Sequence, residues 1–155
     1  MYRIGKAEIN AVARVINEMD LSRVGSKGNR CEKFEAAWAE KIGTKYALLM
    51  CGGGTAALTC SLAGFGIGPG DEVIVPAYTW LASATCVLTV GAIPVLAEID
   101  ETLGLDPDDF ERKIGSRTKA VIPVHMVGRP ADLSRICAIA KKRGLKVIED
   151  ACQMV

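Results

Sequence analysis

Two periodicities divide the apolar and polar positions along the chain. Near the amino terminus, apolar side chains recur at helical spacing in residues 6–19 and 31–42, with a polar, glycine-containing loop between them. From residue 46 onward, short continuous apolar runs alternate with segments of helical composition. Continuous apolar runs are typical of strands that are buried on both faces. The pattern therefore predicts two helices followed by a repeated strand–helix arrangement.

The later part of the chain predicts a sheet of parallel strands. Strands rich in valine, isoleucine, leucine and alanine are expected at residues 46–50, 72–75, 94–99, 119–124 and 146–149. Helices are expected between them at residues 55–65, 79–90, from 106 onward, and 131–143. Asp106 and Pro107 provide an N-cap and a first helical residue, and Gly144 provides a stop. We expect an α/β fold with a mostly parallel sheet flanked by helices.

Composition changes this picture little. Half of the 155 residues are hydrophobic, 24% are charged, and the formal net charge is +1. The chain has no basic or acidic block and only 5% aromatic residues, so nothing indicates a nucleic-acid surface. No apolar run reaches the ~18 residues expected of a membrane span. We therefore expect neither nucleic-acid nor membrane partners.

Six cysteines and a single histidine, His125, set the expectations for metals and redox state. The cysteines stand at positions 31, 51, 60, 86, 137 and 152, and no two form a C-x-x-C pair. A structural zinc site is therefore not expected. We interpret the cysteines as reduced thiols of a cytoplasmic protein, and the charged, helical start contains no signal-peptide-like apolar segment.

Candidate ligand-binding residues follow the expected strands. In an open parallel sheet, ligands bind outside the carboxyl ends of the strands. Three glycines at residues 52–54 and Thr55 follow the first expected strand, Trp80 follows the second, and Asp150 and Gln153 follow the fifth. A glycine loop, an aromatic ring and a carboxylate would therefore share one rim.

The three glycines admit two readings. Glycine lets the backbone approach an anion closely, and a helix that starts there adds free N–H groups and the positive end of its dipole. The simpler reading is a strand-to-helix turn that needs positive φ. We favour phosphate binding because threonine follows three consecutive glycines at the end of a strand.

Two common phosphate motifs are disfavoured. Residues 52–57 formally fit G-x-G-x-x-A, but a nicotinamide-dinucleotide site also needs an acid at the end of the next strand. That strand ends at Val75, and its acids, Asp71 and Glu72, stand at its start. A P-loop is disfavoured because Gly-Lys-Ser/Thr is missing.

Five segments resemble the DegT/DnrJ/StrS family of aminotransferases. They are GGGTAAL, GIGPGDEVIVPAYTW, GAIPVLAEID, RTKAVIPVHMVGRPADL and GLKVIEDACQ, in this order and at family-like spacing over essentially the whole chain. The resemblance implies a fold-type-I enzyme that uses pyridoxal 5'-phosphate and pyridoxamine 5'-phosphate. Such an enzyme moves an amino group from glutamate or glutamine to a keto-sugar or cyclitol, and works as a homodimer.

The resemblance also implies roles for particular residues. Gly54, Thr55 and Ala56 would hold the cofactor phosphate, and Trp80 would stack on the pyridine ring. These residues all stand at the expected rim, at the carboxyl ends of the strands.

The resemblance implies two further residues in contact with the pyridine ring. Asp150 would pair with the pyridine nitrogen and keep it protonated, which makes the ring an electron sink. Gln153 would contact the side of the phenolic oxygen. For His125 we favour a structural role satisfied by the backbone.

The lysine that such an enzyme needs for its Schiff base is not found at the expected rim. In the family it lies in a glycine-rich motif downstream of the Glu-Asp-Ala-x-Gln stretch. Lys119, Lys141, Lys142 and Lys146 are all expected away from the rim. We therefore expect a truncated, amino-terminal part of such an enzyme that is inactive alone.

The expected organisation follows from this resemblance. Residues 1–30 would form an amino-terminal helix and loop, and residues 31–155 a partial large domain, with the carboxyl-terminal small domain missing. A non-catalytic binding or assembly module with the same fold is the alternative function, because fold does not determine function. A nicotinamide-dinucleotide-binding domain is the third and least favoured.

Overall fold

The computed structural model describes residues 4–154. Backbone contacts divide the chain into two compact units, Met1–Leu49 and Met50–Val155. From the sequence we placed the division after residue 30. The helix that follows residue 30 is part of the first unit, because its Glu35 side chain pairs with Arg23 at 2.5 Å and accepts the backbone N–H of Leu49 at 2.6 Å.

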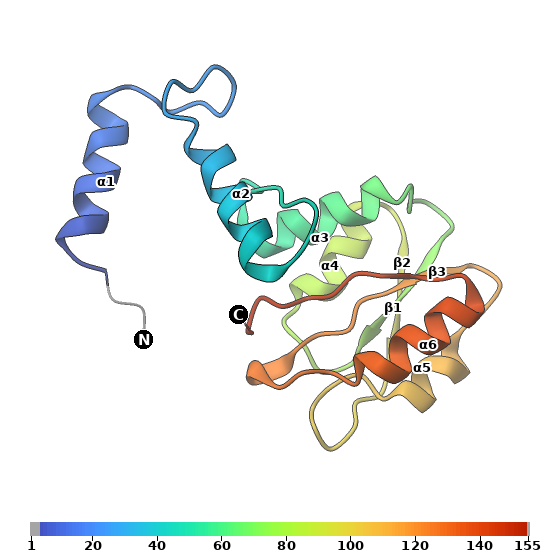
Figure 1. The fold of residues 1–155 in the computed structure, drawn as a ribbon. Helices are drawn as coiled ribbons and strands as arrows, with labels where there is room; N and C mark the ends of the chain where they lie inside the picture. The colour runs from blue at the N-terminus through green and yellow to red at the C-terminus, as the bar shows by residue number, and fades with distance from the viewer. Residues whose placement is uncertain (1–3, 155) are drawn as a thin grey trace. The chain divides into compact units, whose positions relative to one another are not determined.

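The first unit contains two helices, α1 and α2, and the segments around them (Figure 1). They span Lys6–Asn17 and Arg30–Ile42, within two residues of the expected bounds. Gly43 ends α2 with φ of 72°, a left-handed conformation that favours glycine.

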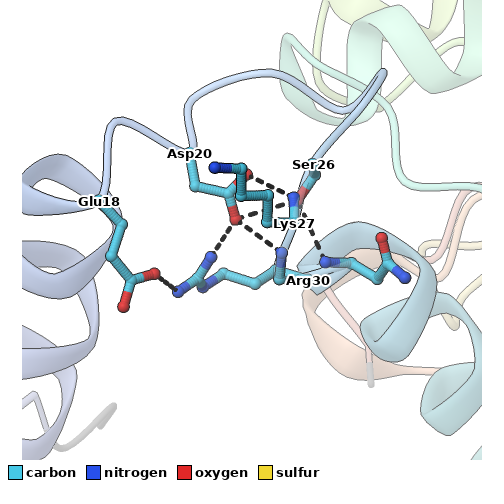
Figure 2. Close-up of polar contacts among 7 residues, drawn as sticks. Glu18, Asp20, Ser26, Lys27 and Arg30 are labelled. Carbon is cyan, nitrogen blue, oxygen red and sulfur yellow. Dashed lines mark hydrogen bonds and ion pairs between the residues drawn. The ribbon is translucent and has the colours of Figure 1, made fainter.

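The loop between α1 and α2 is closed by the carboxylate of Asp20 (Figure 2). Asp20 accepts hydrogen bonds from the Ser26 hydroxyl at 3.0 Å and the Lys27 backbone N–H at 3.1 Å. It also pairs with Arg30, whose guanidinium reaches Glu18 at 2.5 Å. The expected connector is therefore an ordered loop whose backbone is held by one acidic side chain.

The strand expected at residues 46–50 does not form, since these residues are neither strand nor helix. An apolar run predicts burial, but a strand also needs a neighbouring strand to satisfy its backbone N–H and C=O groups. The four-stranded sheet of the second unit does not include this segment.

The second unit is built on a parallel sheet with the order β2-β1-β3-β4. Its strands are β1 (Glu72–Pro76), β2 (Ile93–Ala97), β3 (Thr118–Val121) and β4 (Lys146–Val147). The other four expected strands are thus confirmed, although β2, β3 and β4 end two to three residues early. Beyond them a single parallel bridge joins Val124 to Asp150.

Helices connect these strands and cover the sheet (Figure 1). They are α3 (Gly53–Gly64), α4 (Ala82–Thr89), α5 (Pro107–Lys113) and α6 (Leu133–Arg143), with a short 3₁₀ turn, η1, at Met126–Gly128. The expected start of α5 is confirmed, because the Asp106 side chain accepts the N–H of Asp108 at 2.9 Å. Nowhere in residues 4–154 does a helix combine the length and apolar character needed to cross a membrane.

The core has one layer on each face of the sheet. Val73 and Val75 of β1 pack with α3 and α4, whereas Ile74 packs with α5 and α6. Side chains alternate along a strand, so burial of both faces requires the continuous apolar run read from the sequence. Fully burying such side chains stabilises the fold by about 1.5–3 kcal/mol each.

One buried carboxylate ties α5 to the end of β2. Asp109 is 4% exposed and accepts the backbone N–H of Glu98 at 2.7 Å and the Arg112 guanidinium at 2.7 Å. The hydrogen bond from Glu98, followed by that from Arg112, lowers the pKa of Asp109 below its ordinary value of 3.8. A carboxyl group whose pKa is lowered by folding stabilises the folded state at pH values above its unfolded-state pKa. This contribution is lost as the pH falls from there through the folded-state pKa.

We predict that Asp109→Asn lowers the free energy of unfolding near neutral pH, and that its difference from wild type shrinks as pH falls below 3.8. Urea unfolding at several pH values checks this. The matched control on the same helix is Asp108→Asn, whose side chain is 70% exposed and should matter little. A difference that stays constant across the acid range would contradict the role of the charge.

Candidate functional site

A pocket of about 400 Å³ lies at the carboxyl ends of the strands, within the second unit. Of the expected site residues, five line it: Gly54, Thr55, Trp80, Asp150 and Gln153. Ala56 is the exception and does not line the pocket. Gly54 and Leu58, four residues apart, both line the pocket, whereas Ala56 is about 200° around the helix from Gly54 and points elsewhere.

The three glycines at the start of α3 serve two different purposes. Gly52 and Gly53 have φ of 101° and 74°, so the turn that leads into α3 requires left-handed backbone at both. Gly54 is needed for space, because a Cβ there would overlap the sulfur of Cys152. The positive-φ reading is thus met at residues 52–53. The close approach at Gly54 is to Cys152, and phosphate binding stays a prediction.

The amino end of α3 is open for an anion. Its N-cap residue, Gly52, offers no side chain to the free N–H groups of the first turn. Gly54 and Thr55, in that turn, both line the pocket. The helix dipole adds about 0.3–1 kcal/mol for an exposed anion, and up to ~2 kcal/mol for a partly buried one.

Asp150 is the buried charge of the pocket, at 5% exposure. Its backbone is held by β-type hydrogen bonds: its N–H donates to Pro123 at 2.9 Å, and its C=O accepts from His125 at 3.1 Å. Its side chain accepts the Ser83 hydroxyl at Oδ2, 2.9 Å away, and the Cys152 N–H at Oδ1, 3.1 Å away. Both carboxylate oxygens are thus oriented by donors.

Two thiols lie beside Asp150 and stay protonated near neutral pH. Hydrogen bonding to Asp150, with burial adding to it, raises the pKa of Cys152 to about 11. Burial, with the negative charge of Asp150 contributing, raises the pKa of Cys86 to about 11. The pocket therefore holds one negative side chain and no competing thiolate from these cysteines.

Gln153 is oriented by the turn η1. Its Oε1 accepts the backbone N–H of Val127 at 2.8 Å. Because that N–H can only donate, the amide oxygen faces Val127 and the Nε2 group is left as a donor. Val127 itself has φ of 51°, which is rare for a β-branched residue. A strained turn thus holds the amide that the sequence singled out.

Trp80 lies in the loop between β1 and α4 and is 73% exposed. Its ring lines the pocket without being packed into the core. Thr79, in the same loop, does not cap α4, because the N-cap is Leu81 and the Thr79 hydroxyl lies 2.9 Å from that of Ser83.

Ser83 and Cys152 are functional candidates that the sequence reading missed. Ser83 is fully buried, and it binds a carboxylate 67 positions away in sequence. A lone serine in an otherwise apolar helical segment was the available signal. Its partner could not be read from the sequence, because the contact depends on the sheet.

His125 has a structural environment. Its Nδ1 accepts the backbone N–H of Ala131 at 3.1 Å, so the ring proton lies on Nε2 and is donated to Glu149 at 2.9 Å. The backbone partner was expected and Glu149 was not. The ring does not line the pocket.

The lysines singled out earlier lie away from the pocket. Lys119 and Lys146 border a separate hollow at the amino ends of β3 and β4. Lys141 and Lys142 are in the last turn of α6. Within residues 4–154, no lysine lines the pocket, and no cluster of three His, Cys, Asp or Glu side chains is arranged for a metal ion.

The acids that a dinucleotide site would need are also at the wrong end of β1. Asp71 accepts the backbone N–H of Gly68 at 3.1 Å, and Glu72 pairs with Arg117 at 2.6 Å. The strand ends at Pro76, without a carboxylate.

Known proteins resemble this chain over most of its length. GDP-perosamine synthase from Caulobacter vibrioides is 44% identical over 142 residues, which is 91% of this chain and 38% of that relative. An aminotransferase from Psychrobacter cryohalolentis superimposes with a TM-score of 0.92 at 37% identity, over 99% of this chain and 38% of that one. NtdA from Bacillus subtilis, solved with bound pyridoxamine phosphate, gives 0.88 at 34% identity, over 98% of this chain and 35% of that one.

The chain thus spans about 38% of the length of the curated relatives it matches. Its mostly parallel, helix-flanked sheet is the fold of fold-type-I aminotransferases, as expected. The model of the DegT/DnrJ/EryC1/StrS aminotransferase family matches residues 3–155. With this match, the chain belongs to that family.

Proposed function

We propose that this chain is the cofactor-binding part of an aminotransferase that uses pyridoxal and pyridoxamine phosphate. The proposed reaction moves an amino group from glutamate or glutamine to a keto-sugar or cyclitol. The relatives named for sugar biosynthesis support this substrate class. The homodimer and the cytoplasmic location are part of the proposal; six free cysteines are consistent with a reducing compartment.

The observation that carries the proposal is the set of groups on one pocket wall. An uncapped helix terminus suits a phosphate, and an exposed indole suits the face of a ring. The buried Asp150 is held by neutral donors, and no ion pair joins it to a cation within residues 4–154. Its negative charge therefore remains for a cationic ring nitrogen. These residues fit a phosphorylated pyridine, because the free N–H groups of the first turn of α3, the indole and the carboxylate all border one pocket.

When bound, the cofactor supplies an amino group and a protonated pyridine ring that accepts electron density. Asp150 would hold the proton on the ring nitrogen through a charge-assisted hydrogen bond. Gln153 would donate from Nε2 to the phenolic oxygen, and Trp80 would cover the ring and exclude water from that face. Gly54 and Thr55 would anchor the phosphate, with Ala56 contributing only its backbone.

The proton-transferring lysine is not among the residues that line this pocket. We therefore propose cofactor binding for this chain and the complete reaction for a protein of the relatives' full length. A non-catalytic role for the 155-residue chain is compatible with the same pocket.

We predict that Asp150→Asn weakens binding of pyridoxamine phosphate to the chain by about 10- to 100-fold, the value of a hydrogen bond to a charged partner. The substitution keeps the size of the side chain and removes its negative charge. Isothermal titration calorimetry measures the affinity. The control is Asp109→Asn, which removes a buried carboxylate outside the pocket and should leave the affinity unchanged. Equal losses in both variants would contradict the assigned role.

Gly54→Ala should also weaken binding, because the new Cβ would overlap the sulfur of Cys152, which lines the pocket and would have to shift. The same Cβ would lie 3.8 Å from the Cys152 Cβ, an ordinary contact. The double variant Gly54→Ala, Cys152→Ala should therefore regain most of the affinity in the same titration. If the double variant binds as weakly as the single one, the contact with Cys152 is not the cause.

The thiol of Cys152 reports on both Asp150 and ligand occupancy. Because its pKa is raised to about 11, little thiolate is present near neutral pH and alkylation should be slow. Asp150→Asn should speed iodoacetamide labelling of Cys152 about tenfold or more, since the leading cause of the raised pKa is removed. Saturating pyridoxamine phosphate should protect Cys152 in the wild-type chain.

Peptide mass spectrometry measures these rates. Cys60 and Cys137, which are exposed and lie outside the pocket, provide internal controls. Unchanged Cys152 labelling in Asp150→Asn would show that the carboxylate does not govern the thiol.

A further inference from the structure

Two hydroxyl groups form a chain that ends at the carboxylate of Asp150. The Ser83 hydroxyl lies 2.9 Å from Asp150 Oδ2. The same hydroxyl lies 2.9 Å from that of Thr79. Ser83 has no exposed surface and Asp150 is 5% exposed, so water competes little for these contacts.

The direction of the chain follows from the donors available. A carboxylate only accepts, so the single Ser83 hydroxyl proton is donated to Asp150. The Ser83 oxygen is then an acceptor, and Thr79 is the donor to it. The chain therefore runs from Thr79 through Ser83 to Asp150.

The two carboxylate oxygens have separate anchors. Oδ2 accepts from Ser83 on α4, whereas Oδ1 accepts the Cys152 N–H at 3.1 Å, two residues along the chain. One donor would leave the carboxyl group free to turn about its Cβ–Cγ bond, but two donors on different elements oppose that rotation. Hydrogen bonds to a buried carboxylate are also the stronger kind, because one partner is charged.

Ser83 is in a position that packing alone does not explain. Its neighbours on α4, Cys86 and Val87, are fully buried in the apolar core, where a hydroxyl without a partner is costly. Only the contacts with Asp150 and Thr79 make a serine acceptable there. Thr79 also stands next to Trp80, so the chain joins the loop that carries the indole to the carboxylate.

We propose that Ser83, supported by Thr79, is a positioning residue that aims the Asp150 carboxylate at the ring nitrogen of the pyridine cofactor. That the carboxylate points at a cofactor rests on the proposed function. That Ser83 holds the carboxylate in one orientation does not depend on that function, and it can be tested without a ligand.

The first experiment measures amide hydrogen exchange at Cys152 by NMR in the ligand-free chain. In Ser83→Ala, the carboxylate loses one anchor, so the Cys152 N–H should exchange about tenfold faster, the equivalent of one lost hydrogen bond. Amides of β1 should be unchanged. Ser83→Cys, nearly isosteric and a weaker donor, should give an intermediate rate.

The second experiment uses pyridoxamine phosphate labelled with ¹⁵N in the ring. Ser83→Ala should bind it about tenfold more weakly. The ¹⁵N shift of the bound ring should move towards that of the unprotonated form, which a merely structural role would not cause. Ser61→Ala is the control, because that hydroxyl bonds only to the backbone of its own helix, at Ala57, 2.8 Å away.

The two experiments distinguish the proposal that the chain binds the cofactor from the proposal that Ser83 positions Asp150. Failure of the wild-type chain to bind pyridoxamine phosphate overturns the proposed function, while the Cys152 exchange rate still decides the positioning. Normal binding with an unchanged ¹⁵N shift and unchanged Cys152 exchange in Ser83→Ala overturns the inference alone. If Ser83→Ala does not fold, Thr79→Val, at a half-buried position, is expected to show both changes to a smaller degree. Its failure to show either overturns the inference.

Discussion

The pocket depends on the parallel pairing of β1 with β3 and of β3 with β4. Because these strands run in the same direction, the segments that follow them emerge at one edge of the sheet. Trp80 follows β1, and Asp150 follows β4 after the single bridge to Val124. Antiparallel pairing would have sent these side chains to opposite edges. The apolar layers on the two faces hold the register on which this meeting of segments rests.

A buried carboxylate without a cationic partner is costly to the fold. Here neutral donors, among them the Ser83 hydroxyl and the Cys152 N–H, offset part of that cost. A lysine or arginine in the same place would stabilise Asp150 more strongly and would also neutralise it. The arrangement retains a buried negative charge on the lining of the pocket, which suits the proposed recognition of a protonated ring. The Asp150 carboxylate, unpaired with any cation within residues 4–154, thus lowers the stability of the fold at the position where the proposed chemistry needs a negative charge.

The backbone around the pocket also includes conformations that cost stability. Gly52 and Gly53 accept left-handed conformations at no steric cost, whereas Val127 adopts one at a cost. The strained residue presents its N–H to Gln153 and so determines which end of that amide is left to donate. Strain at such a position is maintained only because the surrounding structure over-determines it.

The sequence by itself determined the class of fold, four of the strands, the six α-helices of residues 4–154, and the position at the pocket of five of the six residues expected there. These depend on local information: continuous apolar runs, Asp106 and Gly144 at helix ends, and glycines and polar side chains placed just after strands. The five segments that resemble the aminotransferase family identified the cofactor. The prediction of a strand at residues 46–50 was wrong, because an apolar run does not specify which strand it would pair with.

Only the tertiary structure decided how these residues act together. It placed Ser83 against Asp150 across 67 positions, and the Cys152 sulfur where a side chain at Gly54 would lie. It also supplied Glu149 as the partner of His125, and it turned Ala56 away from the pocket. Such contacts depend on strand register and helix rotation, which are determined by packing over the whole sheet and are not encoded in any short segment.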